Sequence, residues 1–239
     1  MMTKTSKKSS TKTMQQPFQC KYCNTKFHKE SSLLRHQCVK KRRHMEANAT
    51  GPRLGLAAFQ KFHEMTSNSK SVKTLDDFIN SQFYIDFVKF GHHIASLRPL
   101  YVDNFVEFVI KSGAKLKDWT SDAIYYAYIV DLLQREPPGS AVERSIEHIV
   151  EWTTQNNCQF NEFFSAISAN EAASMIQTGK ITPWVLYLAS TGDALMSKFN
   201  EDHTRMIGLI IDPSVWARKF KRQPEDVDFI RTILDQAGL

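Results

Sequence analysis

The distribution of apolar residues divides the chain into parts of different character. The first sixteen positions are mostly Lys, Ser, Thr and Gln, with almost nothing to bury. A few isolated apolar side chains follow between residues 17 and 44. From about residue 54 onward, apolar residues recur at helical spacing. We therefore predict a disordered basic tail over 1–16, a small module with a basic exit over 17–44, a linker over 45–53 and a helical domain over 54–239. Within the predicted linker, Gly51-Pro52 indicates a break between structural elements.

Signals for helix starts and stops recur every ten to twenty residues in the last part. Starts are indicated at Thr74, Ser81, Ser140 with Glu143, Asn170, Thr182-Pro183, Asp212-Pro213 and Pro224, and stops at Gly113, Gly179, Gly192 and Gly238. No sustained apolar–polar alternation bounded by hairpin turns interrupts these signals. The predicted fold class is mostly α: a small ββα finger followed by an all-α domain of about eight to ten short helices.

Residues 18–38 have the spacing of a zinc-binding finger. Cys20 and Cys23 form a C-x2-C pair, and twelve residues separate Cys23 from His36. The short gap lets a tight turn aim two thiolates at one ion, and the long gap is enough for a strand and about two turns of helix. Phe18, Phe27 and Leu33 give a three-residue core, too small to fold alone, so we expect one Zn2+ per chain to supply the remaining folding energy.

The fourth ligand is open between two residues. Zinc fingers leave three to five residues between the first His and the fourth ligand, but the positions so defined are Lys40, Lys41 and Arg42, which do not bind zinc. Cys38 is our first expectation, and it requires the helix to end at about His36 and the chain to turn back. His44, eight residues after His36, is the alternative.

These offsets resemble the two-cysteine, two-histidine zinc finger family, in a Cys-Cys-His-Cys variant. The resemblance implies that residues at the start, middle and end of the finger helix face base edges. Counted back from His36, these are Lys29, Ser32 and Arg35. A single finger reads about three base pairs, so any binding is expected to be weakly specific.

Charge is concentrated in the first part of the chain. Residues 1–53 carry thirteen Lys and Arg against two acids, or +11, whereas the remainder carries −5. We expect Lys40, Lys41, Arg42 and Arg43 to lie along a phosphate backbone, with DNA the first expectation. The alternatives are a protein-docking finger and a basic run that is merely a solvated face.

The part beyond residue 53 contains no catalytic signature. It has no phosphate-binding Gly-rich loop, no G-x-S-x-G and no H-E-x-x-H. A second basic cluster, Arg218-Lys219-Phe220-Lys221-Arg222, is explained equally by a second polyanion contact or by a helix end that favours cations. We predict a non-enzymatic adaptor whose helical domain docks to a protein partner, with no small-molecule substrate; a nucleic-acid enzyme is the weaker alternative.

The chain as a whole resembles uncharacterised zinc-finger proteins of T-even-type tailed phages. The H-x-C ending of the finger, the KKRR exit and the segments GLAAFQKF, FVKFGHHI, PLYVDNFVEFV and ITPWVLYL carry this resemblance. It implies no activity, only a setting in the host cytoplasm. A cytoplasmic location also agrees with clustered cysteines and with no apolar stretch approaching ~18 residues.

Overall fold

The structure, a computed structural model, describes residues 18–67 and 71–239; the tail predicted over 1–16 lies outside these residues. The described residues form one two-stranded sheet and fifteen α-helices. The strands are β1 (Phe18–Gln19) and β2 (Lys26–Phe27). The helices are α1 (Glu30–Arg35), α2 (Val39–Glu46), α3 (Thr50–Thr66), α4 (Leu75–Asn80), α5 (Tyr84–Leu97), α6 (Val102–Lys111), α7 (Asp122–Arg135), α8 (Pro138–Asn156), α9 (Phe163–Ala166), α10 (Ala169–Gln177), α11 (Pro183–Leu188), α12 (Gly192–Met196), α13 (Glu201–Ile207), α14 (Pro213–Arg222) and α15 (Pro224–Ala237). Two 3-10 turns, η1 (Leu116–Asp118) and η2 (Phe160–Glu162), complete the set.

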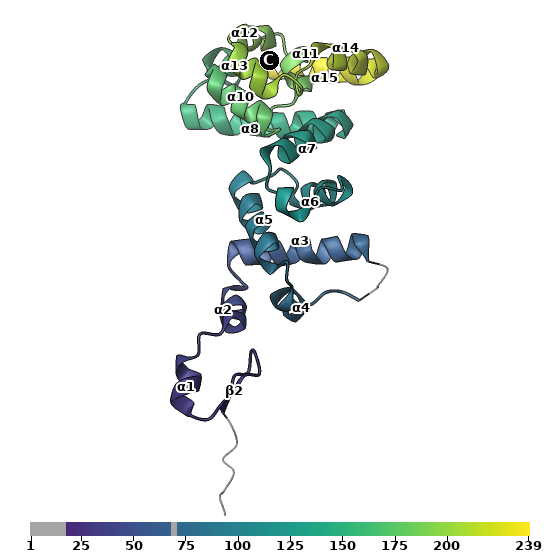
Figure 1. The fold of residues 1–239 in the computed structure, drawn as a ribbon. Helices are drawn as coiled ribbons and strands as arrows, with labels where there is room; N and C mark the ends of the chain where they lie inside the picture. Colours follow the sequence, from purple (N-terminus) through teal and green to yellow (C-terminus); the bar gives the residue numbers. More distant parts are fainter. Residues whose placement is uncertain (1–17, 68–70) are drawn as a thin grey trace, which may run out of the picture.

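The elements follow one another along an elongated molecule (Figure 1). The small sheet and α1 lie at one end, and α2 connects them to the pair α3 and α5. Helices α11 to α15 lie at the other end. The predicted mostly α fold with a small N-terminal module is therefore confirmed.

Helices α3 and α5 cross closely because glycine stands at the contact. A Cβ atom on Gly91 of α5 would lie 2.0 Å from the backbone oxygen of Gly51, and one on Gly55 would lie 2.6 Å from the backbone oxygen of Phe87. No side chain fits at either position, so the two backbones touch directly. This crossing fixes α5, whose Tyr84 contacts Arg43 of α2.

Aromatic side chains fill the core next to this crossing. Trp119 is fully buried, and its ring centroid lies 5.1 Å from that of Phe90 and 5.6 Å from that of Phe87. The predominantly edge-on ring contacts in this cluster suit the quadrupole of aromatic rings. These aromatic side chains thus form part of the core.

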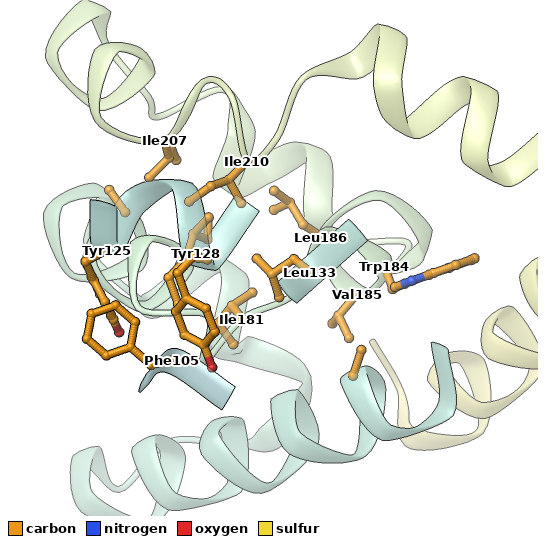
Figure 2. Close-up of a cluster of buried hydrophobic side chains, with 14 of the residues drawn as sticks. Phe105, Tyr125, Tyr128, Leu133, Ile181, Trp184, Val185, Leu186, Ile207 and Ile210 are labelled. Atoms are coloured by element: carbon orange, nitrogen blue, oxygen red, sulfur yellow. The ribbon is translucent and has the colours of Figure 1, made fainter. Parts of the chain in front are cut away.

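The core continues through α7 into the C-terminal helices (Figure 2). Tyr125, Tyr128 and Leu133 come from α7, and Trp184 and Leu186 come from α11. This core holds α7 and α11 at fixed positions, to which the later helices attach.

One buried ion pair lies beside this core. The guanidinium of Arg144 donates from both terminal nitrogens to Glu136, with 2.7 Å from Nη2 to Oε2, and its Nε donates to the carbonyl oxygen of Gly179 at 2.9 Å. Tyr101 adds a hydroxyl 3.2 Å from Glu136. Because each charge has a partner, burial of both is tolerated.

Several predicted helix starts agree with the structure. The side chains of Thr74, Thr182 and Asp212 each accept a backbone N–H at the start of a helix. Thr74 forms a full capping box, since Asp77 accepts the Thr74 N–H at 2.8 Å. Pro224 opens α15 as predicted.

Other sequence expectations were wrong in detail. Ser81 follows α4 as its C-cap, α8 begins at Pro138 so that Ser140 lies inside it, and Gly192 starts α12 rather than ending a helix. The described part of the helical domain has thirteen α-helices from α3 onward, not eight to ten. Helices of one turn, such as α9, leave no separate periodic pattern in the sequence.

The segment predicted as a linker is largely helical. Residues 45 and 46 end α2, and α3 begins at Thr50. Gly51 and Pro52, which the sequence predicts as a break between elements, are buried in the first turn of α3. Proline is tolerated there because the first turn needs no N–H donor, and a Cβ on Gly51 would lie 2.4 Å from the His92 ring of α5.

Candidate metal centre and the basic helix beside it

A two-stranded hairpin positions the first two cysteines. β1 pairs with β2 antiparallel, with Phe18 opposite Phe27. Between the strands, Asn24 adopts a left-handed conformation at φ 59°, and the Cys20 N–H donates to the carbonyl oxygen of Thr25 at 3.0 Å. The turn curls the C-x2-C segment, so both thiols point to one side.

The chain reversal that Cys38 requires is present. Helix α1 ends at Arg35, and His36 has extended backbone angles of φ −67° and ψ 113°. Cys38 then stands as the N-cap of α2, where its Sγ accepts the N–H of Lys41 at 3.4 Å. Two helices therefore meet at a bend, and the side chains of His36 and Cys38 share one side of it.

Four donor atoms converge at this bend. The ligand atoms of Cys20, Cys23, His36 and Cys38 all lie within 4.8 Å of one another, and 3.2 Å separates Cys23 Sγ from His36 Nε2. Four ligands at metal–sulfur distances near 2.3 Å would be separated by about 4 Å in a tetrahedron. The cluster therefore has the donor set and the size to hold one metal ion.

The thiols differ in their surroundings. Cys20 and Cys38 are buried, and burial raises the pKa of Cys38. The Thr25 hydroxyl, 3.1 Å from Cys23 Sγ, and the Thr25 backbone lower the pKa of Cys23 to about 6. One thiolate is thus available near neutral pH, and a bound cation would favour the others.

His44 lies away from the cluster. It sits in α2, where its Nε2 is 3.2 Å from the carboxylate of Asp76 and its ring centroid is 5.2 Å from that of Tyr22. Tyr22 lies between the two cysteines of the hairpin, so His44 connects the finger to α4. The arrangement favours Cys38 over His44 as the fourth position.

The apolar support of the module is thin. Phe27 packs against His36 with 4.9 Å between ring centroids, whereas Phe18 is exposed and α1 has no buried residue. Phe27 and Leu33 are half-buried. So small a core cannot offset the chain entropy of about twenty residues, which makes a metal ion the natural source of stability.

The residues expected to face base edges are exposed. Lys29 is the N-cap of α1, and Ser32 and Arg35 follow within that helix. Steps of three residues keep them on neighbouring parts of one helical face. Arg35 also donates from Nε to the carbonyl oxygen of Ser31 at 3.2 Å.

The four side chains of the basic run Lys40–Arg43 have different surroundings on α2. Lys41 and Arg42 are exposed and Lys40 is half-buried. Arg43, expected to contact phosphate, instead faces the helical part: its Nη1 donates to the carbonyl oxygen of Ile79 at 2.6 Å, and its guanidinium lies 4.1 Å from the Tyr84 ring centroid. The guanidinium neutralises the C-terminal end of α4, where free carbonyls attract cations.

Large apolar side chains are also exposed at this end of the molecule. Leu34 is 79% exposed, Met45 72% and Val39 52%. Val39 and Met45 help line a pocket of about 510 Å³ that also includes His36 and Cys38. The surface around the cluster is therefore mixed, with cations and apolar groups side by side.

The anchoring residues were missed by sequence reasoning. Tyr22, Asp76 and Tyr84 hold α2 and the hairpin against the helical part, yet each looks like an ordinary surface or core residue in the sequence. Thirty-six positions separate Arg43 from Ile79. No local pattern links positions so far apart.

Comparison with known proteins gave no relative. No protein-family model, no curated protein and no solved structure matches this chain. The resemblance to phage proteins stays a prediction. Within the residues that the structure describes, no helix is long and apolar enough to cross a membrane.

Proposed function

We propose that residues 18–46 form a zinc finger whose second helix carries phosphate contacts to nucleic acid. What supports zinc is the donor set, three thiols and one imidazole, since soft thiolates with imidazole in a tetrahedral arrangement are typical of structural zinc sites. What supports nucleic acid is the exposure of Lys41 and Arg42 immediately beside that centre. Neither makes a side-chain hydrogen bond or ion pair within the described residues.

The two helices of the module make different contacts with nucleic acid. Lys40, Lys41 and Arg42 on α2 contact phosphates, which gives affinity for any sequence. Lys29, Ser32 and Arg35 on α1 face base edges, which gives modest preference. Arg43 takes no part in the contact, because its guanidinium is held by α4 and Tyr84.

The test is a salt-dependent titration of the zinc-loaded full chain with labelled duplex and single-stranded DNA and RNA. Lys41→Gln/Arg42→Gln should weaken binding to all sequences and flatten the duplex salt slope by about 1.8, since each lost phosphate contact removes about 0.9. The matched control is Lys115→Gln/Lys117→Gln, which removes two exposed charges from the helical domain. Equal affinity of the Lys41/Arg42 variant and wild type would reject the proposal.

Protein docking by the finger is the second candidate function. The exposed Leu34, Val39 and Met45 support it, because three large apolar side chains gathered on a small module suit a protein surface. Replacing all three by Ser should then abolish capture of a partner while nucleic-acid affinity stays unchanged. Loss of nucleic-acid affinity in this variant would count against the second candidate.

We also propose that the helical domain docks to a protein. Leu209, in the turn after α13, is 62% exposed, and Phe229, in α15, is 60% exposed, which supports an apolar contact in the C-terminal part of the chain. Crosslinking the full chain in its native cell, with Leu209→Ser/Phe229→Ser as the comparison, tests this. An unchanged set of crosslinked proteins in the variant would reject it.

A further inference from the structure

Helix α14 has two faces of opposite character. Trp216 and Phe220 face inward, and their ring centroids lie 5.9 Å and 4.9 Å from that of Trp184. These contacts fix the helix on the C-terminal core. On the other side, Arg218, Lys221 and Arg222 are exposed, at the i, i+3 and i+4 positions of one helical face.

Lys219 holds a positive charge at the edge of this face. Its Nζ donates to the carbonyl oxygens of Gln134 at 2.8 Å and Leu133 at 3.3 Å, and lies 4.9 Å from the Trp216 ring centroid. Burial lowers the pKa of Lys219, and the charges of Glu136 and Asp226 act in the opposite direction. An ammonium group has three donors, so one N–H is left after the two carbonyls.

The cations line a pocket that contains no carboxylate. Its volume is about 490 Å³, and its lining residues are Gln134, Val215, Arg218, Lys219, Arg222 and Gln223. Arg218 donates from Nε to the carbonyl oxygen of Ser214 at 3.1 Å, which leaves its terminal nitrogens to face outward. Within the described residues the Arg222 side chain makes no hydrogen bond or ion pair. Three cations thus share one pocket whose lining residues include no acid, while Glu136 and Asp226 act on Lys219, and Asp212 acts on Arg218, from outside the lining.

The helix dipole alone does not explain this arrangement. Cations are favoured in the last turn of a helix, where Lys219, Lys221 and Arg222 lie. The ammonium of Lys219, however, bonds to the end of α7 rather than to its own helix. Arg218 lies one turn before Arg222, and Asp212, the N-cap of α14, acts on its charge.

We infer that this face of α14 binds the phosphate backbone of nucleic acid as a second contact, separate from the finger. The row of cations continues past the pocket to Lys221, which suits an extended strand of phosphates better than one isolated anion. Helix α14 lies near the opposite end of the elongated molecule from α2 (Figure 1). One chain therefore carries two cationic surfaces that can engage two segments of nucleic acid, although residues 54–239 are acidic in total.

The test is the same titration, carried out on the full chain with labelled duplex and single-stranded oligonucleotides at two salt concentrations. Arg218→Gln/Arg222→Gln should lower affinity about tenfold at low salt and flatten the duplex salt slope by about 1.8. Arg218→Lys/Arg222→Lys should retain most of the affinity, because the charge stays. The matched control Lys115→Gln/Lys117→Gln should bind like wild type.

Three results would overturn the inference: wild-type affinity in the Arg218/Arg222 variant, an equal loss in the control, or no nucleic-acid binding by the wild-type chain. A loss confined to the Arg218/Arg222 variant, with the Lys41/Arg42 variant unchanged, would support it while rejecting the finger contact. Tryptophan emission reports local folding, because Trp184 and Trp216 pack under α14. If emission changes in the double variant, the single Arg222→Gln at the exposed helix end replaces it, with a loss of about threefold expected.

Discussion

The guanidinium of Arg43 lies over the ring of Tyr84, with 4.1 Å between its central carbon and the ring centroid. The same guanidinium donates to the carbonyl oxygen of Ile79 at 2.6 Å. Together with the 3.2 Å contact between His44 and Asp76, this pair fixes α2 to α4 and α5. The finger is thereby attached to the helical part through α2 and not by a free tether.

Replacing Arg43 should loosen this attachment without removing the metal. Arg43→Met loses one charge-assisted hydrogen bond and one cation–π contact, and we expect the contact of α2 to weaken by about 1–3 kcal/mol. Hydrogen exchange of residues 39–49 should accelerate while metal content stays the same. Arg42→Met, at an exposed position, is the control and should exchange like wild type. Unchanged exchange in Arg43→Met would show that the contact contributes little.

Metal content should depend on Cys38 and not on His44. One zinc ion per chain is expected for the wild-type protein, and Cys20→Ser, Cys23→Ser, His36→Ala and Cys38→Ser should each lose it, because three remaining ligands bind a structural zinc ion much more weakly. His44→Ala should retain the ion. Metal analysis of the purified variants measures this directly. Retention in Cys38→Ser together with loss in His44→Ala would reverse the assignment of the fourth ligand.

Chelation should unfold the finger and leave the helical part folded. All four tryptophans, Trp119, Trp152, Trp184 and Trp216, lie beyond residue 54, so their emission reports that part alone. We expect tryptophan emission and its thermal transition to stay nearly unchanged after chelation, while the far-ultraviolet signal falls slightly as α1 and α2 lose order. A large shift of the tryptophan transition would show that the finger supports the fold of the helical part.

The crossing of α3 and α5 should not tolerate a methyl group. Gly91→Ala places a Cβ 2.0 Å from the Gly51 backbone oxygen, which forces the helices apart and should cost about 3 kcal/mol or more. Gly139→Ala is the matched control, since a Cβ there meets nothing within 4 Å and alanine favours a helix by up to about 1 kcal/mol. Denaturant titration of both variants measures the difference. Equal stability of the two variants would contradict the close crossing.

The sequence was sufficient wherever the relevant physics is local. The spacing of Cys20, Cys23 and His36 depends on one turn and one short helix, and the structure brings these residues together. Helix starts at Thr74 and Asp212 are local too, because the capping side chain accepts a hydrogen bond from a backbone N–H only two or three residues further along the chain. The mostly α class followed from periodicity, which also needs only neighbouring residues.

Only the tertiary structure decided which charges are free and which are engaged. Arg43 and Arg42 are adjacent cations in the sequence, yet one is bound to a carbonyl thirty-six positions away and the other is exposed. The Lys219 ammonium likewise donates to the carbonyl oxygen of Gln134 at the end of α7, eighty-five positions earlier. A sequence reports the charge of each side chain, but the partner of that charge depends on how distant helices pack, and packing sums many weak apolar contacts that no short pattern encodes.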